Sequence, residues 1–158
     1  MPICNPSDLK GLIKKGERLL GLDVGTKTIG MALSDTTLMV ATPFDTIRRA
    51  RFRDDVQRLA AEIATHGVGG IVVGLPIGMD GHESPRTQGV RQFVKNLLAH
   101  VAKPVAFWDE RLSTAAVERQ MIDADLSRKR RAEIIDKVAA AYILQGLLDR
   151  LASSRRAQ

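Results

Sequence analysis

Asp23 is the first residue of this sequence that needs a chemical explanation. It stands within the apolar run LLGLDV, residues 19–24, and the run is followed by GTKT, residues 25–28. A lone carboxylate in such a run costs several kcal/mol to bury unless a partner compensates it. Two interpretations follow: Asp23 is hydrogen-bonded within the fold, or it holds a cation.

Asp136 is a second carboxylate that the sequence directs toward a core. It lies four, seven and eleven residues before Ala140, Ile143 and Leu147, so the four residues share one helical stripe. The side chain of Asp136 is therefore expected to face inward. The alternative interpretation is an ordinary ion pair with a neighbouring basic residue, or a favourable position near the start of a helix.

Asp109 and Glu110 directly follow an apolar segment that is predicted to be a strand. The alternative is a solvated strand end at which Arg111 neutralises its neighbour. Carboxylates brought close to Asp23 and Asp136 would raise one another's pKa unless a divalent cation compensates their charge. Mg²⁺ and Mn²⁺ prefer oxygen ligands, and two such ions about 3.5–4 Å apart commonly serve displacement at phosphorus. The acidic set therefore predicts phosphodiester chemistry.

Composition narrows the class of protein. The 158 residues are 44% hydrophobic, which suits one globular domain, and the 24 Lys and Arg exceed the 18 Asp and Glu to give a net charge of +6. A basic protein is expected to meet a polyanion such as nucleic acid. The single cysteine, Cys4, excludes an intramolecular disulfide and a cysteine-rich zinc site. The first residues contain no apolar signal core, so a cytoplasmic protein without a membrane partner is expected.

The histidines do not suggest a catalytic triad. His66, His82 and His100 each fall in a loop or at a predicted helix end, where a solvated surface position is the simplest interpretation.

Hydrophobic periodicity predicts the elements that must position the acidic residues. The predicted strands are 18–24, 28–34, 38–42, 70–73 and 105–108. The predicted helices begin after Arg53, at Pro85 behind the N-cap Ser84, at Ser113 toward Ala124, and at about 131, the last of them running to 151. The Gly- and Pro-rich segment 74–81 is predicted to be a loop.

This order of elements predicts an α/β fold with a mixed sheet and helices packed on it. The carboxyl ends of the parallel strands are expected to collect Asp23, the loop 74–81 and the pair Asp109–Glu110. One domain is expected over residues 17–152, with an N-terminal segment 1–16 of no assigned role and a frayed tail at 153–158.

Four sequence blocks carry a family resemblance. LDVGTKTIG, IVVGLPIGMDG, DERLST and IDKVAAAYILQ, in this order, resemble the YqgF family over nearly the whole chain. Members of that family are described as Holliday junction resolvase-like proteins and as nucleases that process the 5′ end of pre-16S ribosomal RNA. The resemblance implies a ribonuclease H-like fold with a five-stranded mixed sheet and a divalent-metal site. It carries the family's acidic residues onto Asp23, Glu110 with Asp109 beside it, and Asp136.

Two departures from the family's pattern stand out. Many members have Asn where this chain has Gly78, so the loop loses a polar side chain there. Relative to other nucleases of the wider fold, the strand 70–73 carries no carboxylate, so the middle ligand is expected from Asp109–Glu110 instead.

The segment DVGTKTIG also resembles the first phosphate-binding hairpin of sugar kinases and actin-like ATPases. Those proteins clamp a nucleotide between two domains of this kind, whereas 158 residues provide one. We therefore interpret the hairpin as Asp23 on a metal ion with Gly25, Thr26 and Lys27 near a phosphate. For Lys27 the alternative is a solvated turn lysine.

The sequence thus predicts a metal-dependent nuclease that uses Mg²⁺ or Mn²⁺. Asp23, Glu110 and Asp136 are the predicted ligands, and Asp109 is a ligand or supports one. The predicted substrate contacts are Gly25, Thr26, Lys27, Gly74, Pro76, Arg111, Arg128, Lys129 and Arg130. A second basic cluster, Arg48, Arg49, Arg51 and Arg53, surrounds the start of the first long helix, and either cluster could instead be solvated surface.

Three functions remain open at this point. The leading substrate is the 5′ end of pre-16S ribosomal RNA, with branched DNA as the alternative for a Holliday junction resolvase. A non-catalytic RNA-binding or ribosome assembly factor is the third possibility. The sequence does not decide between a monomer and a homodimer.

Overall fold

A mixed six-stranded sheet forms the centre of the molecule, with strand order β1-β6-β5-β2-β3-β4. The computed structural model describes residues 3–112 and 128–156, and the side chains of residues 3–112 and 134–153. The strands are β1 (Ile3–Cys4), β2 (Arg18–Val24), β3 (Thr28–Ser34), β4 (Ala41–Arg48), β5 (Val68–Leu75) and β6 (Val105–Asp109). The helices are α1 (Leu9–Leu12), α2 (Phe52–His66), α3 (Pro85–Leu98) and α5 (Arg128–Arg156), with short 3₁₀ turns η1 (Pro6–Asp8) and η2 (Glu110–Leu112).

The sheet combines an antiparallel meander with parallel strands. β2, β3 and β4 pair antiparallel, whereas β5 runs parallel to both β2 and β6, and β1 runs parallel to β6. The carboxyl ends of β2, β5 and β6 consequently lie at the same end of the sheet. Ligands bind at this end in open α/β sheets.

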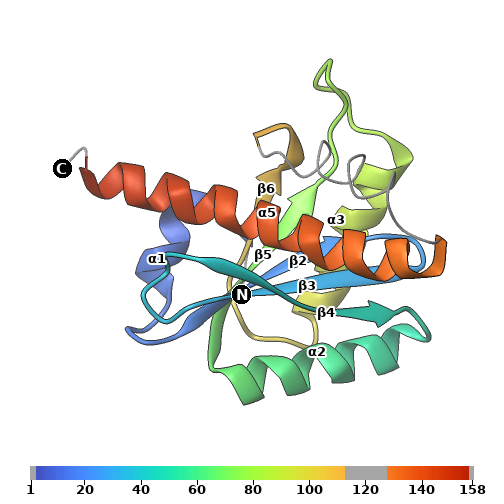
Figure 1. Ribbon diagram of the computed structural model, residues 1–158, viewed down its shortest axis with the longest axis horizontal. Helices are drawn as coiled ribbons and strands as arrows, with labels where there is room; N and C mark the ends of the chain where they lie inside the picture. Colours follow the sequence, from blue (N-terminus) through green and yellow to red (C-terminus); the bar gives the residue numbers. More distant parts are fainter. Residues whose placement is uncertain (1–2, 113–127, 157–158) are drawn as a thin grey trace.

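Helices cover both faces of this sheet. The long α5 crosses one face, while α2 and α3 lie on the other (Figure 1). In β2, Leu20 and Leu22 belong to the core under α2 and α3, and Leu19 belongs to the core under α5. A strand buried on both faces reads as a continuous apolar run, which is why β2 and β5 show so little alternation in sequence.

Helix boundaries follow local signals in the sequence. Ser84 caps α3 by accepting a hydrogen bond from the amide of Thr87, and Pro85 occupies the first helical position. The predicted start of this helix is confirmed. α2 ends at Gly67, whose φ of 62° is in the left-handed region that glycine adopts without a side-chain penalty.

The structure corrects the predicted sheet at both edges. The sheet has six strands rather than five, because Ile3–Cys4 adds β1 from the segment to which no role was assigned. The strand predicted at 38–42 was wrong: β4 spans Ala41–Arg48 and contains Pro43. Proline is tolerated there because β4 is an edge strand with a neighbour on one side only. On the open side no strand needs the backbone N–H that proline lacks.

Several boundaries also differ from the prediction. β5 begins at Val68 rather than at 70, β6 ends at Asp109 rather than at 108, and α2 begins at Phe52 rather than after Arg53. β5 runs to Leu75, so Gly74 belongs to the strand and the loop begins at Pro76. Helix α5 extends beyond the predicted 131–151 at both ends. The short helix predicted from Ser113 toward Ala124 lies outside the described residues.

Within the described ranges, no helix combines the length and the apolar character needed to cross a membrane.

Candidate active site

Asp23 lies near the carboxyl end of β2 and points toward α5. Its neighbours Leu22 and Val24 both belong to the core under α2 and α3, so alternation along the strand directs Asp23 to the opposite face. The residue is only 3% exposed. Across the sheet it pairs with Gly30 of β3. In the parallel register Leu22 pairs with Val73 of β5, so one residue further along, Asp23 is level with Gly74.

Helix α5 brings Asp136 over the neighbouring strand. A Cβ atom placed on Gly30 would lie 2.0 Å from the carbonyl oxygen of Asp136, so the helix backbone rests directly on this glycine. The hydroxyl of Thr28, on the same face of β3, donates a short hydrogen bond to Oδ2 of Asp136. Because Gly30 is the cross-strand partner of Asp23, both aspartates belong to one small region between β2, β3 and α5.

Glu110 approaches the same region from the other side. A Cβ atom on Gly74 would lie 3.0 Å from Oε1 of Glu110 and 2.3 Å from Cδ1 of Ile143 in α5. The Glu110 carboxylate therefore reaches over Gly74 on the face that α5 covers. Since Gly74 is level with Asp23, the three carboxylates come from three separate segments to one face and one end of the sheet.

Asp109 is held differently from its neighbour Glu110. The guanidinium of Arg111 donates from Nη2 to Oδ2 of Asp109 at 2.6 Å, and the Arg111 amide donates to Oδ1 at 2.9 Å. The hydrogen bond from this guanidinium holds the pKa of Asp109 below its usual value. Asp109 and Arg111 thus neutralise each other, as the alternative interpretation of the sequence had it, and the adjacent Glu110 is the carboxylate that reaches the α5 face.

The predicted substrate contacts come from several separate segments. Thr26 and Lys27 are exposed at the β2–β3 turn, which Gly25 closes by donating its amide to the carbonyl oxygen of Thr28 at 2.8 Å. Pro76 begins the next loop, and its carbonyl oxygen accepts a short hydrogen bond from the hydroxyl of Thr87.

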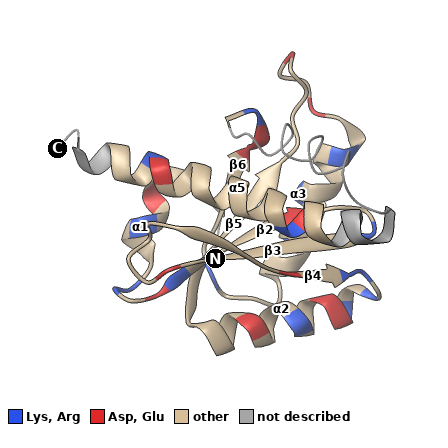
Figure 2. Cartoon of the chain, viewed as in Figure 1, with Lys and Arg blue, Asp and Glu red and all other residues tan. Residues whose placement is uncertain are grey.

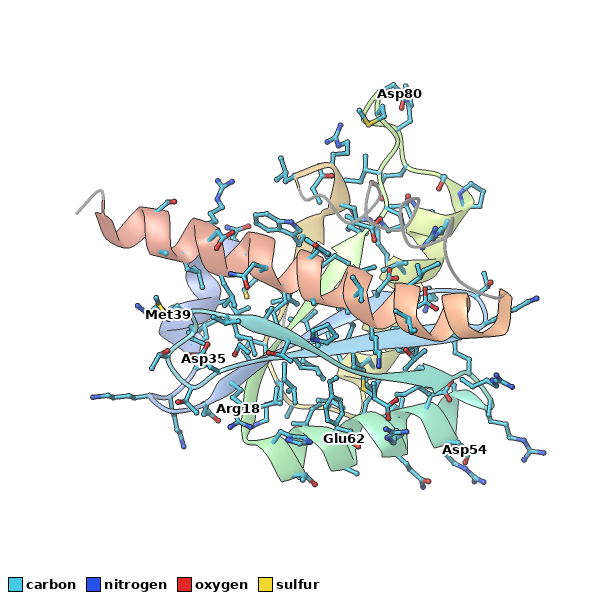
Figure 3. All side chains as sticks on the ribbon, viewed as in Figure 1. Arg18, Asp35, Met39, Asp54, Glu62 and Asp80 are labelled. Carbon is cyan, nitrogen blue, oxygen red and sulfur yellow. The ribbon has the colours of Figure 1, made fainter. Side chains whose placement is uncertain are left out.

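The loop after β5 stands away from the sheet, with Asp80 at its tip (Figure 3). The amide of Gly78 donates to the carbonyl oxygen of His82 at 3.0 Å, which closes this loop on itself. Arg128, Lys129 and Arg130 form the first turn of α5, and their side chains lie outside those that the structure describes.

Arg49 is a residue that sequence reasoning placed only in a general basic cluster. Its Nη1 donates to the carbonyl oxygen of Gly25 at 2.7 Å. Its backbone amide donates to the carbonyl oxygen of Lys27 at 2.8 Å. It therefore braces the turn that follows Asp23. No local signal could have revealed this contact, because it joins residues 24 positions apart through the fold.

Thr28 is the second missed residue. The sequence did carry a signal for it: Thr28 and Gly30 are two residues apart in a strand, so both point to the face to which Asp23 points. Its partner Asp136 is 108 residues away, so the hydrogen bond itself could not be read from the sequence.

The donor chemistry of the site fits a hard divalent cation, since all three groups are carboxylates. In the part of the chain that the structure describes, no three His, Cys, Asp or Glu side chains are gathered closely enough to hold one metal ion between them. Metal binding by Asp23, Glu110 and Asp136 therefore stays a prediction.

Solved structures with the same architecture show the class of fold. Thermus thermophilus RuvC in complex with a Holliday junction substrate aligns with a TM-score of 0.55 at 12% identity, covering 87% of this chain and 97% of that one. The yeast mitochondrial Holliday junction resolvase Ydc2 also gives 0.55, at 11% identity, covering 94% of this chain and 84% of that one. The fold is the ribonuclease H-like fold that these proteins share, as expected.

Sequence relatives identify the family within that class. The family model RuvX, described as Holliday junction resolvase, matches residues 17–150. A protein of Paramagnetospirillum magneticum named "Putative pre-16S rRNA nuclease" is 58% identical over 149 residues, covering 94% of this chain and 96% of its own. A protein of the same name from Methylocella silvestris is 52% identical over 149 residues, covering 94% and 92%. The chain belongs to the RuvX family, which confirms the resemblance to YqgF proteins.

Proposed function

We propose that this protein is a metal-dependent nuclease that hydrolyses phosphodiester bonds in structured RNA, with the 5′ end of pre-16S ribosomal RNA as its leading substrate. One observation carries the proposal: Asp23, Asp136 and Glu110 approach one face of the sheet at the carboxyl end of β2. The names of the curated relatives and the net charge of +6 agree with a nucleic acid substrate.

Each side chain of the site has a separate task. Asp23, Glu110 and Asp136 would hold Mg²⁺ or Mn²⁺, whose chemistry when bound is to activate water and to neutralise charge on the phosphate. Thr28 orients Asp136 by donating to its Oδ2. Lys27 stands exposed at the turn beside Asp23, where its ammonium would contact a substrate phosphate.

Cleavage assays with single carboxylate variants test the proposal. Asp23→Asn, Glu110→Gln and Asp136→Asn should each lower the rate of Mg²⁺- or Mn²⁺-dependent cleavage of labelled pre-16S RNA by about a hundredfold or more, because each removes one negative ligand. Asp109→Asn is the matched control. It should cost much less, since Asp109 is bound by Arg111.

Metal binding needs its own measurement. Isothermal titration of the parent protein with Mn²⁺ should show binding that Asp23→Asn weakens and Asp109→Asn leaves in place. Cleavage that persists in EDTA, or Asp23→Asn at the parent rate, contradicts the metal-dependent mechanism.

Branched DNA is the second candidate substrate, favoured by the description of the RuvX family. A resolvase cuts two strands symmetrically and so requires two copies of its active site. Four-way DNA junctions in the same assay, together with the mass of the complex in solution, separate this function from RNA processing. Tight RNA binding without cleavage of either substrate would identify an assembly factor instead.

A further inference from the structure

A hollow of about 360 Å³ lies beside the β2–β3 turn, next to the candidate active site but on the other side of the sheet. Val24, the residue after Asp23, and Thr26 of the turn both line it. The first turns of α3 form the opposite wall. The hollow is therefore reached from the same end of β2 as the carboxylates.

The charge of this hollow is of one sign. Among the residues that the structure describes, Arg49 and Arg86 are the only charged ones that line it, and no carboxylate of that part of the chain does so. Arg86 is exposed in the first turn of α3. Two guanidinium groups without an acidic neighbour in the lining suit an anionic ligand, and phosphate in particular, because a guanidinium can donate two parallel hydrogen bonds to it.

Arg49 is already held in position. Besides its hydrogen bond to Gly25, its guanidinium lies 5.3 Å from the ring centroid of Phe93 and 3.9 Å from Oδ2 of Asp55. Asp55 is itself only 2% exposed and accepts a hydrogen bond from the amide of Ala50. A guanidinium fixed by these contacts loses little further freedom when a ligand binds.

The rest of the lining is apolar. Val24 and Val90 are 4% and 3% exposed, and Pro85 and Gly89 add surface without a polar side chain. The volume of the hollow falls in the lower part of the range of about 300–1,000 Å³ that is typical of small-molecule sites. A ligand that combines an anionic group with a flat, weakly polar body matches both parts of this lining.

We propose that this hollow binds one unpaired nucleotide of the substrate, its base against Val24 and Val90 and its phosphate at Arg49 and Arg86. The inference rests on the proposed function, since it places this nucleotide near the cleaved bond. Aromatic residues make up only 4% of the chain, so an arginine plane and an apolar wall take the place of an aromatic stacking platform. A base inside a duplex must first be unstacked and unpaired, so the hollow favours a single-stranded position beside a duplex.

Gly89→Leu tests the hollow directly. A Cβ atom at Gly89 meets no atom of the described residues within 4 Å, and Gly89 lines the hollow, so a leucine there has room at its Cβ and would occupy part of the hollow. Leucine is also the better helix former. Gly11→Leu is the matched control, since Gly11 is also helical and also open. The readout is fluorescence anisotropy of two labelled RNAs in EDTA, a blunt duplex and the same duplex with a single-stranded overhang.

The parent protein should bind the overhang RNA more tightly than the blunt duplex. Gly89→Leu should weaken binding of the overhang RNA about tenfold and leave the affinity for the blunt duplex unchanged. Gly11→Leu should change neither affinity. Arg86→Gln should reduce the affinity for the overhang RNA and the salt dependence of that affinity together.

An unchanged preference in Gly89→Leu, or an equal loss for both RNAs, overturns the proposal. Because EDTA prevents metal-dependent cleavage, this result is independent of the nuclease assay. If the protein cleaves RNA and Gly89→Leu does not change its binding preference, the proposed function stands and the nucleotide site is wrong. If Gly89→Leu removes the preference but the protein does not cleave RNA, the nucleotide site stands and the nuclease function is wrong.

Discussion

At the scale of single residues, one hydrogen bond fixes a carboxylate of the candidate site. The hydroxyl of Thr28 donates to Oδ2 of Asp136, so one carboxylate oxygen is oriented before any ligand arrives. Side chains that orient a metal ligand in this way commonly contribute about 10–100-fold to metal affinity or to rate. Thr28 is therefore a positioning residue in the proposed mechanism.

Thr28→Val should lower the cleavage rate about tenfold while leaving the fold intact. Valine keeps the β-branched shape that suits a strand but cannot donate a hydrogen bond. Thr28→Ser retains the hydroxyl and should restore most of the rate. The measurement is the cleavage rate as a function of Mn²⁺ concentration, in which Thr28→Val should require more Mn²⁺ for half-maximal rate. Full activity of Thr28→Val at the parent's Mn²⁺ requirement would show that the bond is not needed.

At the scale of elements, glycines determine how α5 lies on the sheet. A Cβ atom at Gly21 would lie 2.8 Å from Cβ of Leu144, and one at Gly146 would lie 2.9 Å from Nε1 of Trp108. Together with Gly30, these glycines let α5 approach β2, β3 and β6 more closely than larger residues would permit. The same packing that buries the apolar stripe of α5 therefore sets the position of Asp136.

Gly30→Ala should destabilise the protein by about 1–3 kcal/mol and greatly reduce cleavage. The added methyl group would meet the backbone carbonyl of Asp136, which cannot turn aside as a flexible side chain can. Gly89→Ala is the control, because it meets open space in a helix and should stabilise the fold by about 0.5–1 kcal/mol. Urea unfolding of the three proteins gives both changes. A Gly30→Ala protein as stable as the parent would mean that α5 can shift freely.

Periodicity predicted the central elements because their sequences carry strong local signals. β2, β3 and α3 have uninterrupted apolar patterns or a complete N-cap, and the predicted site residues Asp23 and Asp136 followed from those patterns. The edge strands were missed for the opposite reason. β1 is two residues long, and β4 contains Pro43, so neither shows the alternation of a strand that is buried on one face.

Contacts across the fold could not be predicted in the same way. The sequence left open whether Asp109 or Glu110 serves the site, because the two are adjacent and equally acidic. The distinction comes from Arg111, which binds Asp109, and from Gly74, over which Glu110 reaches. The hollow beside the turn joins Val24, Arg49 and α3, which no local pattern connects.

At the scale of the whole molecule, basic residues gather where substrate would approach the site. Figure 2 shows Lys and Arg positions at the β4–α2 connection, beyond the end of β4. Arg48 pairs in register with Thr28, and the amide of Arg49 bonds to Lys27, so this connection lies against the β2–β3 turn. Part of the excess of Lys and Arg over Asp and Glu in this chain therefore lies beside the candidate active site.

RNA binding should therefore weaken steeply with salt. Each phosphate contact adds about 0.9 to the slope of log affinity against log salt on duplex DNA and about 0.7 on single strands. Lys27→Gln should reduce the measured slope by roughly one such contact, whereas Lys103→Gln should not, because Lys103 precedes β6 at the opposite end of the sheet. Anisotropy titrations over a range of salt concentrations in EDTA provide the slopes. Equal slopes for Lys27→Gln and the parent would remove Lys27 from the substrate contacts.

The position of α5 after the strands in the sequence has a consequence during protein synthesis. β2 and β6 leave the ribosome first, but the face that carries Asp23 stays uncovered until α5 emerges, and Asp136 arrives with the same helix. Under the proposed mechanism, a nascent or truncated chain therefore cannot cut RNA. By the same mechanism, the protein becomes able to cut the ribosomal RNA beside which it is made only after α5 has docked on the sheet.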